Sequence, residues 1–195
     1  MHTVASPRSP EEALGMLRAA MGYLAAADAT AMAAETQAQC LRALERLHAI
    51  ETAARASVLG ALASGQSRAA SGQIQAGAAG FSPRAWLIRE TGITTGAATG
   101  HAAWVRRAVA HPQVAEALAE GYLLSESVAR TICGWTDKLP EDCRLAADAI
   151  LIVAVKTGAN LDDLAEVFGG IYTLSRPLPR LAPVAETTPA SAIAI

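Results

Sequence analysis

The sequence has few aromatic residues, almost no lysine and no excess of basic charge. Aromatic residues make up 4% of the 195 residues. Lysine occurs only at Lys138 and Lys156, and 16 basic residues stand against 18 acidic ones, which gives a formal net charge of −2. A protein that binds nucleic acid tightly on its own usually carries a basic excess, so this balance argues against strong autonomous DNA binding.

Signatures of catalysis and metal binding are also missing. The chain contains no phosphate-loop, Rossmann, His-Glu-x-x-His or Gly-x-Ser-x-Gly motif. His101 and His111 stand ten residues apart without a second pair of ligands. The three cysteines form no Cys-x-x-Cys pair, which predicts reduced thiols packed as small apolar groups. We therefore expect no cofactor and no bound metal, and we do not expect the chain to be an enzyme.

Targeting and membrane segments are not apparent either. The first residues lack the apolar stretch of a secretory signal. The longest apolar run, 149–155, is far shorter than the roughly 20 residues that a membrane span requires. These features predict a soluble, cytoplasmic protein without a membrane partner.

What the sequence does contain is alanine, at 46 of its 195 positions. Alanine is the strongest helix former, and strand-forming residues are sparse, so the composition predicts an all-α fold. Ser9-Pro10, with Glu12 three residues after the serine, is a good helix start. The stripe that follows recurs at three- and four-residue steps and consists of Leu14, Leu17, Met21 and Leu24.

The longest periodic stretch runs from Thr30 to Ala63 and predicts one long helix. We expect it to lie along the body of the protein or to pair with another helix; a coiled coil is the alternative, although its heptad pattern is imperfect. The residues expected to share its apolar face are Leu44, Leu47, Ile50, Ala54, Val58 and Leu62.

The remainder is divided by glycines and prolines. Residues 64–80 are glycine-rich and predict a flexible connector. A compact group of short helices is expected next, at 83–91, 95–110, 112–120, 126–136, 140–157 and from Asn160 to about 172. The apolar run within 140–157 could also be a buried strand, but its flanking caps favour helix. The expected helical domain spans 9–172, and the proline-rich tail 176–195 is expected to be disordered.

Two groups of residues could contact nucleic acid. The helices on either side of Gly121 have the outline of a helix-turn-helix, with an ordinary helical corner as the alternative. In the recognition geometry the second helix would present Glu126, Ser127, Arg130 and Thr131 outward, and only Arg130 suits phosphate or guanine.

The second group is a cluster of arginines interleaved with tryptophans. It contains Arg84, Arg89, Arg106 and Arg107, together with Trp86 and Trp104. Stacking on single strands is conceivable for such a set, but Trp86 follows a helix cap closely and neighbours Leu87, which predicts burial in the core. His111 precedes Pro112 and is expected at a helix N-cap. The nucleic-acid-binding candidates are Arg106, Arg107 and Arg130.

The order of features between Phe81 and Trp135 is the most specific in the chain. Trp86-Leu87 is followed by an amphipathic helix, then by His-Pro-x-Val-x-x-Ala-Leu-x-x-Gly at 111–121 and Leu-Ser-x-x-x-Ala at 124–129. This order resembles the domain of unknown function 222 family, also called the 13E12 repeat family, which precedes HNH endonuclease modules in many actinobacterial proteins. The resemblance runs from about residue 14 to residue 172.

The resemblance implies a helical domain of unestablished activity beside a nuclease, and its apolar motifs carry over no active-site residue. Family members usually continue into an HNH module, whereas this chain runs into a proline-rich tail. We interpret it as a truncated or split member that does not cleave DNA itself.

The sequence thus leads to two hypotheses of function. The first is a non-catalytic accessory domain of an HNH-endonuclease-like, mobile-element-associated protein, which helps to position DNA or a partner subunit and binds DNA only weakly. The alternative is a structural helical module that forms a homo-oligomer and has no nucleic-acid role. A basic face would favour the first, and a wide exposed apolar stripe would favour the second.

Overall fold

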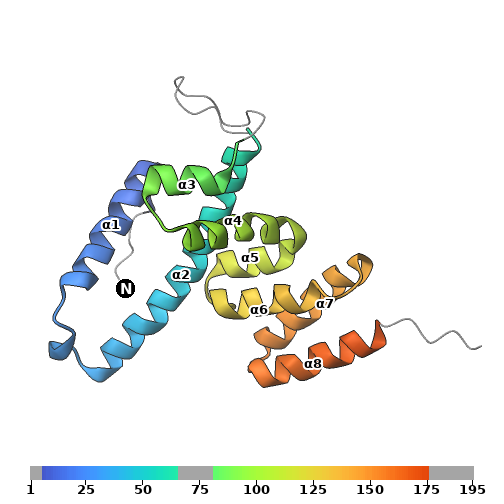
Figure 1. Cartoon of the computed structure of the whole chain (residues 1–195). Helices are drawn as coiled ribbons and strands as arrows, with labels where there is room; N and C mark the ends of the chain where they lie inside the picture. The colour runs from blue at the N-terminus through green and yellow to red at the C-terminus, as the bar shows by residue number, and fades with distance from the viewer. Residues whose placement is uncertain (1–5, 66–80, 176–195) are drawn as a thin grey trace, which may run out of the picture. The chain divides into compact units, whose positions relative to one another are not determined.

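The computed structural model describes residues 6–65 and 81–175, and it is all-helical within them (Figure 1). The predicted all-α class is confirmed, and no strand occurs in these two ranges. Most of the connector and the whole tail 176–195 lie outside the described residues. The elements are α1 (Pro10–Ala26), the 3-10 helix η1 (Ala29–Ala31), α2 (Ala34–Ala63), α3 (Pro83–Thr91), α4 (Thr95–Ala110), α5 (Pro112–Glu120), α6 (Glu126–Thr136), α7 (Glu141–Lys156) and α8 (Leu161–Leu174).

The chain divides into two compact units with a boundary between Arg46 and Leu47, inside α2. Unit 1 contains α1, η1 and the first part of α2. Unit 2 contains the rest of α2 and α3 to α8.

In unit 1 the helix starts follow local capping chemistry. Ser9 Oγ accepts the backbone N–H of Glu12 at 3.2 Å, as the sequence predicted. The expected start of the long helix at Thr30 is wrong. The Asp28 carboxylate accepts both the N–H and the hydroxyl of Thr30, at 2.9 and 2.7 Å. This local turn competes with helix formation, so η1 intervenes and α2 begins at Ala34.

The expected apolar face of α2 is also wrong. Leu47 and Ile50 are 38% and 40% exposed, and Val58 is 70% exposed. The buried side chains of α2 are instead Ala49, Thr52, Ala56 and Leu59. Ala49 and Ala56 belong to the main core cluster of unit 2, and Leu59 belongs to a smaller cluster with Leu87 and Ala98.

The core of unit 2 is formed by short helices that each pack against the next, with α5 also against α7. Its largest fully buried apolar residues are Leu118, Ile132, Leu151 and Leu164, which come from α5, α6, α7 and α8. The 3.6-residue pattern of 140–157 forms α7 rather than a strand, as its flanking caps predicted.

The boundaries of these helices match the sequence signals. Gly92 and Gly121 end α3 and α5 with φ of +66° and +72°, in the left-handed region that favours glycine. Ser82 and Ser125 each accept a backbone N–H from the first turn of the following helix. Asn160 and Asp163 form a reciprocal capping box at the start of α8.

Candidate functional site

Two of the predicted site residues line a cavity of about 280 Å³ in unit 2. These are Arg106 and Arg107, which are consecutive on α4. The Arg107 guanidinium also lies 5.4 Å from the ring centre of Trp104, a cation–π distance. Trp104 is only 4% exposed. It therefore belongs to the core, and the Arg107 guanidinium lies over its ring. The remaining lining residues are Ala103, Ala110, His111 and Asp137.

His111 forms the inner end of this cavity through a buried polar network. Its Nδ1 donates to Asp148 Oδ2 at 2.9 Å, and the Thr136 hydroxyl donates to Asp148 Oδ1 at 2.7 Å. All three side chains are at most 1% exposed. His111 stands at the N-cap position of α5, as expected, but makes no side-chain cap bond. The side chain instead binds the buried carboxylate of Asp148, which is a stronger partner for the imidazole than a backbone N–H.

Two carboxylates act on the His111 imidazole. Burial by itself would lower its pKa, but the hydrogen bonds and charges of Asp148 and Asp137 outweigh burial and raise the pKa above its ordinary value. The protonated ring can then donate from Nδ1 to Asp148 and from Nε2 to Asp137 Oδ1, which lies 3.2 Å away.

Asp137 is the point where this network meets solvent. Its side chain is 51% exposed, and the oxygen that faces His111 also lies 3.8 Å from Arg144 Nε of α7. Arg144 Nε is buried and has no hydrogen-bond partner. A buried donor without an acceptor costs free energy, so this nitrogen has unused binding capacity beside the cavity.

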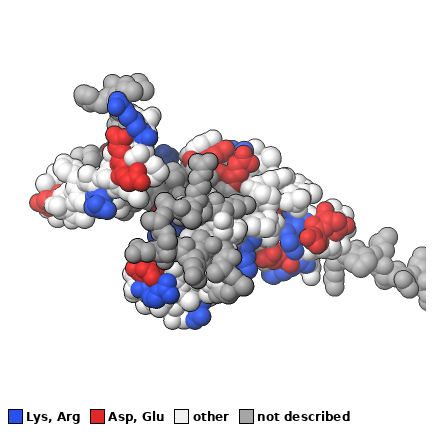
Figure 2. Space-filling view, turned by 90° about the horizontal axis from the view of Figure 1, so that it is seen from above, with Lys and Arg blue, Asp and Glu red and all other residues white. Residues whose placement is uncertain are grey.

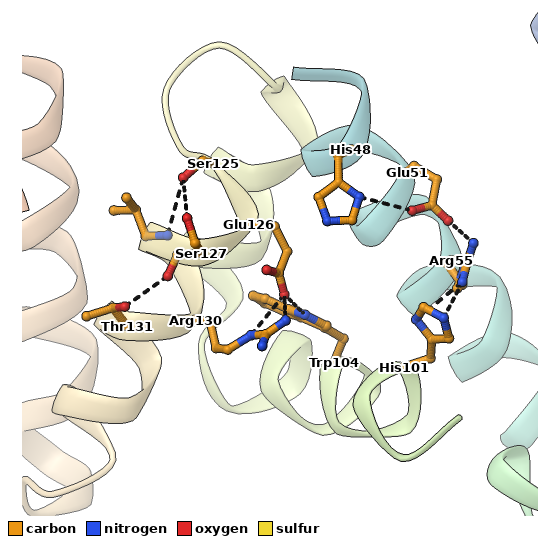
Figure 3. A network of polar contacts seen from close by, with 11 residues as sticks. His48, Glu51, Arg55, His101, Trp104, Ser125, Glu126, Ser127, Arg130 and Thr131 are labelled. Atoms are coloured by element: carbon orange, nitrogen blue, oxygen red, sulfur yellow. Dashed lines mark hydrogen bonds and ion pairs between the residues drawn. The ribbon is translucent and has the colours of Figure 1, made fainter. Parts of the chain in front are cut away.

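Arg130, the third predicted residue, does not line this cavity. It forms an ion pair with Glu126, and its Nε donates to Glu126 Oε1 at 3.0 Å (Figure 3). The expectation that Glu126 points outward is wrong, because Glu126 is 8% exposed and accepts the Trp104 indole N–H at 2.8 Å. Burial favours a higher pKa for Glu126, but hydrogen bonds from Arg130 and Trp104 hold the pKa below its ordinary range. The first turn of α6 is therefore anchored to α4.

A second polar group links α2 to α4 within unit 2. Arg55 pairs with Glu51 one turn earlier and contacts the ring of His101, and Glu51 also faces His48 (Figure 3). Burial and the Arg55 charge lower the pKa of His101. Both effects favour the neutral form of the His101 ring.

The remaining predicted residues have structural environments. Trp86 is partly buried and packs against a small cluster of Leu59, Leu87 and Ala98, so its predicted core position is only partial. Cys133 is buried, and burial raises the pKa of its thiol to about 12, so it is an unreactive packing group. Cys40 and Cys143 are also free thiols.

The face drawn in Figure 2 has mixed charge. On this face, basic and acidic residues lie next to one another rather than in regions of one sign. Across residues 6–65 and 81–175, no group of three or more His, Cys, Asp or Glu side chains is arranged to hold a metal ion. No helix in these ranges combines the length and apolarity needed to cross a bilayer.

Comparisons of the chain with family models, with characterised proteins and with solved structures find no match.

Sequence reasoning missed Thr136 and Asp148, which form the buried network behind His111, and Arg144, which lines the neighbouring cavity. The sequence does contain a sign that Asp148 is buried. It precedes Leu151 and Ile152 of α7 by three and four residues and therefore shares their buried face. A carboxylate on a buried face requires a partner. Nothing in the sequence, however, identifies His111 as that partner, because the two lie 37 residues apart.

Proposed function

We propose that the chain is a non-catalytic helical accessory module of the cytoplasm that associates with a second copy of itself through the apolar face of α1. This face consists of Leu14, Leu17, Met21 and Leu24. The observation that carries the proposal is that none of the 17 residues of α1 is buried, although the spacing of this face is that of a helix-packing surface.

An uncovered α1 would be marginally stable. Isolated helices of this length are marginal in water, because most helix stability in proteins comes from packing of an apolar face. Gly15 and Gly22 weaken α1 further, by about 1 kcal/mol each relative to alanine. Burying one exposed leucine or methionine contributes about 1.5–3 kcal/mol, and Leu14, Leu17 and Met21 are 60%, 44% and 40% exposed. Covering this face would therefore decide whether α1 is stable.

The charges of α1 suit a second copy. Glu11 lies in its first turn, and Arg18 lies about two turns later. When two α1 helices cross antiparallel near Leu14 and Leu17, Glu11 of one copy lies near Arg18 of the other. Such a pairing is self-complementary, as a two-fold interface requires.

The test is the mass of the chain in solution. Light scattering after size-exclusion chromatography should give a dimer that Leu17→Glu converts to a monomer. Ala19→Glu, which places the same charge on the opposite side of α1, should leave the dimer intact. A wild-type chain that stays monomeric at all concentrations would overturn the proposal.

Nucleic-acid binding is the second candidate function. The observation that favours it is the pair Arg106 and Arg107 at one cavity, and the resemblance of residues 81–135 to the 13E12 repeat family supports a place beside an HNH nuclease subunit. On this proposal the module holds phosphates of DNA weakly while a separate subunit cleaves it. Fluorescence anisotropy with duplex and single-stranded DNA tests this proposal. Absence of binding at low salt would overturn it.

A further inference from the structure

We propose that the cavity lined by Arg106, Arg107, His111 and Asp137 is a binding site for a phosphate group. Such a site would provide the contact to DNA phosphates that the nucleic-acid-binding candidate requires. The proposal does not depend on that candidate, because free phosphate and a nucleic-acid backbone offer the same oxygens. Four observations support the proposal.

The first is the concentration of donors. Arg106 and Arg107 line the cavity from α4, and Arg106 also lines a neighbouring cavity of about 420 Å³ together with Arg144. Guanidinium groups bind phosphate through paired, charge-assisted hydrogen bonds. The acidic residues here are Asp137 in the first cavity and Glu141 in the second, so three arginines face two carboxylates.

The second observation is the anchored donor at the inner end. Asp148 is fully buried and fixes His111 through Nδ1, which directs Nε2 toward the cavity. A ring nitrogen that is held by a buried partner is already oriented for a ligand. When the ring is protonated, an entering oxygen would therefore meet an Nε2–H donor that needs no reorientation.

The third observation is that an anion already occupies part of the site. Asp137 Oδ1 lies 3.2 Å from His111 Nε2 and 3.8 Å from Arg144 Nε. Because the Asp137 side chain is 51% exposed, it can turn into solvent, whereas His111 is 1% exposed and bound to Asp148. The carboxylate thus marks the place where a phosphate oxygen would bind and competes with it.

The fourth observation is the unsatisfied Arg144 Nε. It is the one buried side-chain nitrogen or oxygen without a hydrogen-bond partner in the described part of the chain. The distance of 3.8 Å to Asp137 is too long for a hydrogen bond. A phosphate, with more acceptor oxygens than a carboxylate, could satisfy Arg144 and His111 together.

The experiment titrates the full chain with inorganic phosphate at constant ionic strength. Nitrogen-detected NMR of the His111 ring and calorimetry follow the binding. We expect saturable binding of one phosphate with a shift of the Nε2 resonance. Arg106→Gln should weaken it at least about fivefold, as loss of one charge-assisted hydrogen bond implies. Arg84→Gln, which removes a charge elsewhere, should not.

The decisive variant is Asp137→Asn, which removes the competing carboxylate and should tighten phosphate binding. Its matched control is Asp142→Asn, which changes the net charge equally at an exposed position of α7 and should have little effect. If both variants tighten binding equally, the effect is general electrostatics and the proposal is wrong. Absence of saturable binding to the folded wild type would overturn it as well.

A competition arm separates this site from nucleic-acid binding. If duplex DNA displaces phosphate, the site holds backbone phosphates. If phosphate binds and DNA does not compete, the site stands and the nucleic-acid candidate fails. If DNA binds while Arg106→Gln and Asp137→Asn leave its affinity unchanged, the DNA contact lies elsewhere, and the phosphate site stands only if inorganic phosphate still binds there.

Discussion

Single buried charges determine much of the structure of unit 2. Glu126 and Asp148 lie on faces that would otherwise be apolar, and each is held by donors from another element: Trp104 for Glu126, and His111 and Thr136 for Asp148. A buried carboxylate that loses such a donor keeps its desolvation cost. These contacts therefore join α4 to α6, and α7 to α6 and to the start of α5.

Trp104→Phe tests the contact between α4 and α6. Phenylalanine fills most of the indole volume but cannot donate to Glu126 Oε1, which leaves a buried carboxylate one donor short. We expect a loss of about 1–3 kcal/mol in the free energy of unfolding, measured by urea denaturation. Glu126→Gln in the Trp104→Phe background should recover part of this loss. If Trp104→Phe alone costs less than about 0.5 kcal/mol, the hydrogen bond contributes little.

The raised pKa of His111 predicts a pH-dependent stability. Because the folded pKa lies above the unfolded value of about 6.5, the stabilising contribution is complete below pH 6.5 and is lost as pH rises through the folded pKa. Urea denaturation at a series of pH values should show this decline. His111→Gln should remove it, and Asp137→Asn should shift it to lower pH. A stability that rises over the same window would contradict the assignment.

At the scale of elements, helix caps were predictable and helix faces were not. Ser82, Gly121 and Asn160 act within a few residues of themselves, so local sequence is sufficient to place them. The buried face of α2 depends on its tertiary neighbours, and it contains Ala49, Ala56 and Leu59 rather than Leu47 and Val58. The candidate site could be predicted only in part for the same reason. Arg106 and Arg107 were identified from the sequence as an arginine cluster, but Asp137, which shares their cavity, is distant along the chain.

A pair of alanine substitutions tests the small-residue face of α2. Ala56→Leu places a large side chain on the buried face, where Ala56 is 4% exposed, and overpacking should cost about 1–3 kcal/mol. Ala54→Leu makes the same change at an exposed position and should cost less than about 0.5 kcal/mol. Thermal denaturation of both variants compares them directly. Equal costs would mean that the wrong face has been identified.

At the scale of the whole molecule, charge limits what the chain can bind. The formal net charge is −2, and Arg130 is engaged by Glu126. We expect DNA affinity no tighter than roughly 10⁻⁴–10⁻⁶ M at physiological salt, with a shallow salt dependence, because each neutralised phosphate contributes a slope of about −0.9. Charge removal at Arg106 or Arg107 should weaken it more than at Arg130. Nanomolar binding by anisotropy would contradict this prediction.

Because the boundary between the units lies inside α2, the two parts of this helix should differ in amide hydrogen exchange. α2 buries no side chain before Leu47 but four after it. Backbone amides before Leu47 should exchange with deuterium through small local openings, whereas those around Ala56 should exchange only when unit 2 unfolds. Mass spectrometry of exchanged peptides should therefore find two protection regimes within one continuous helix, with the step near Arg46. Uniform protection along α2 would contradict this prediction.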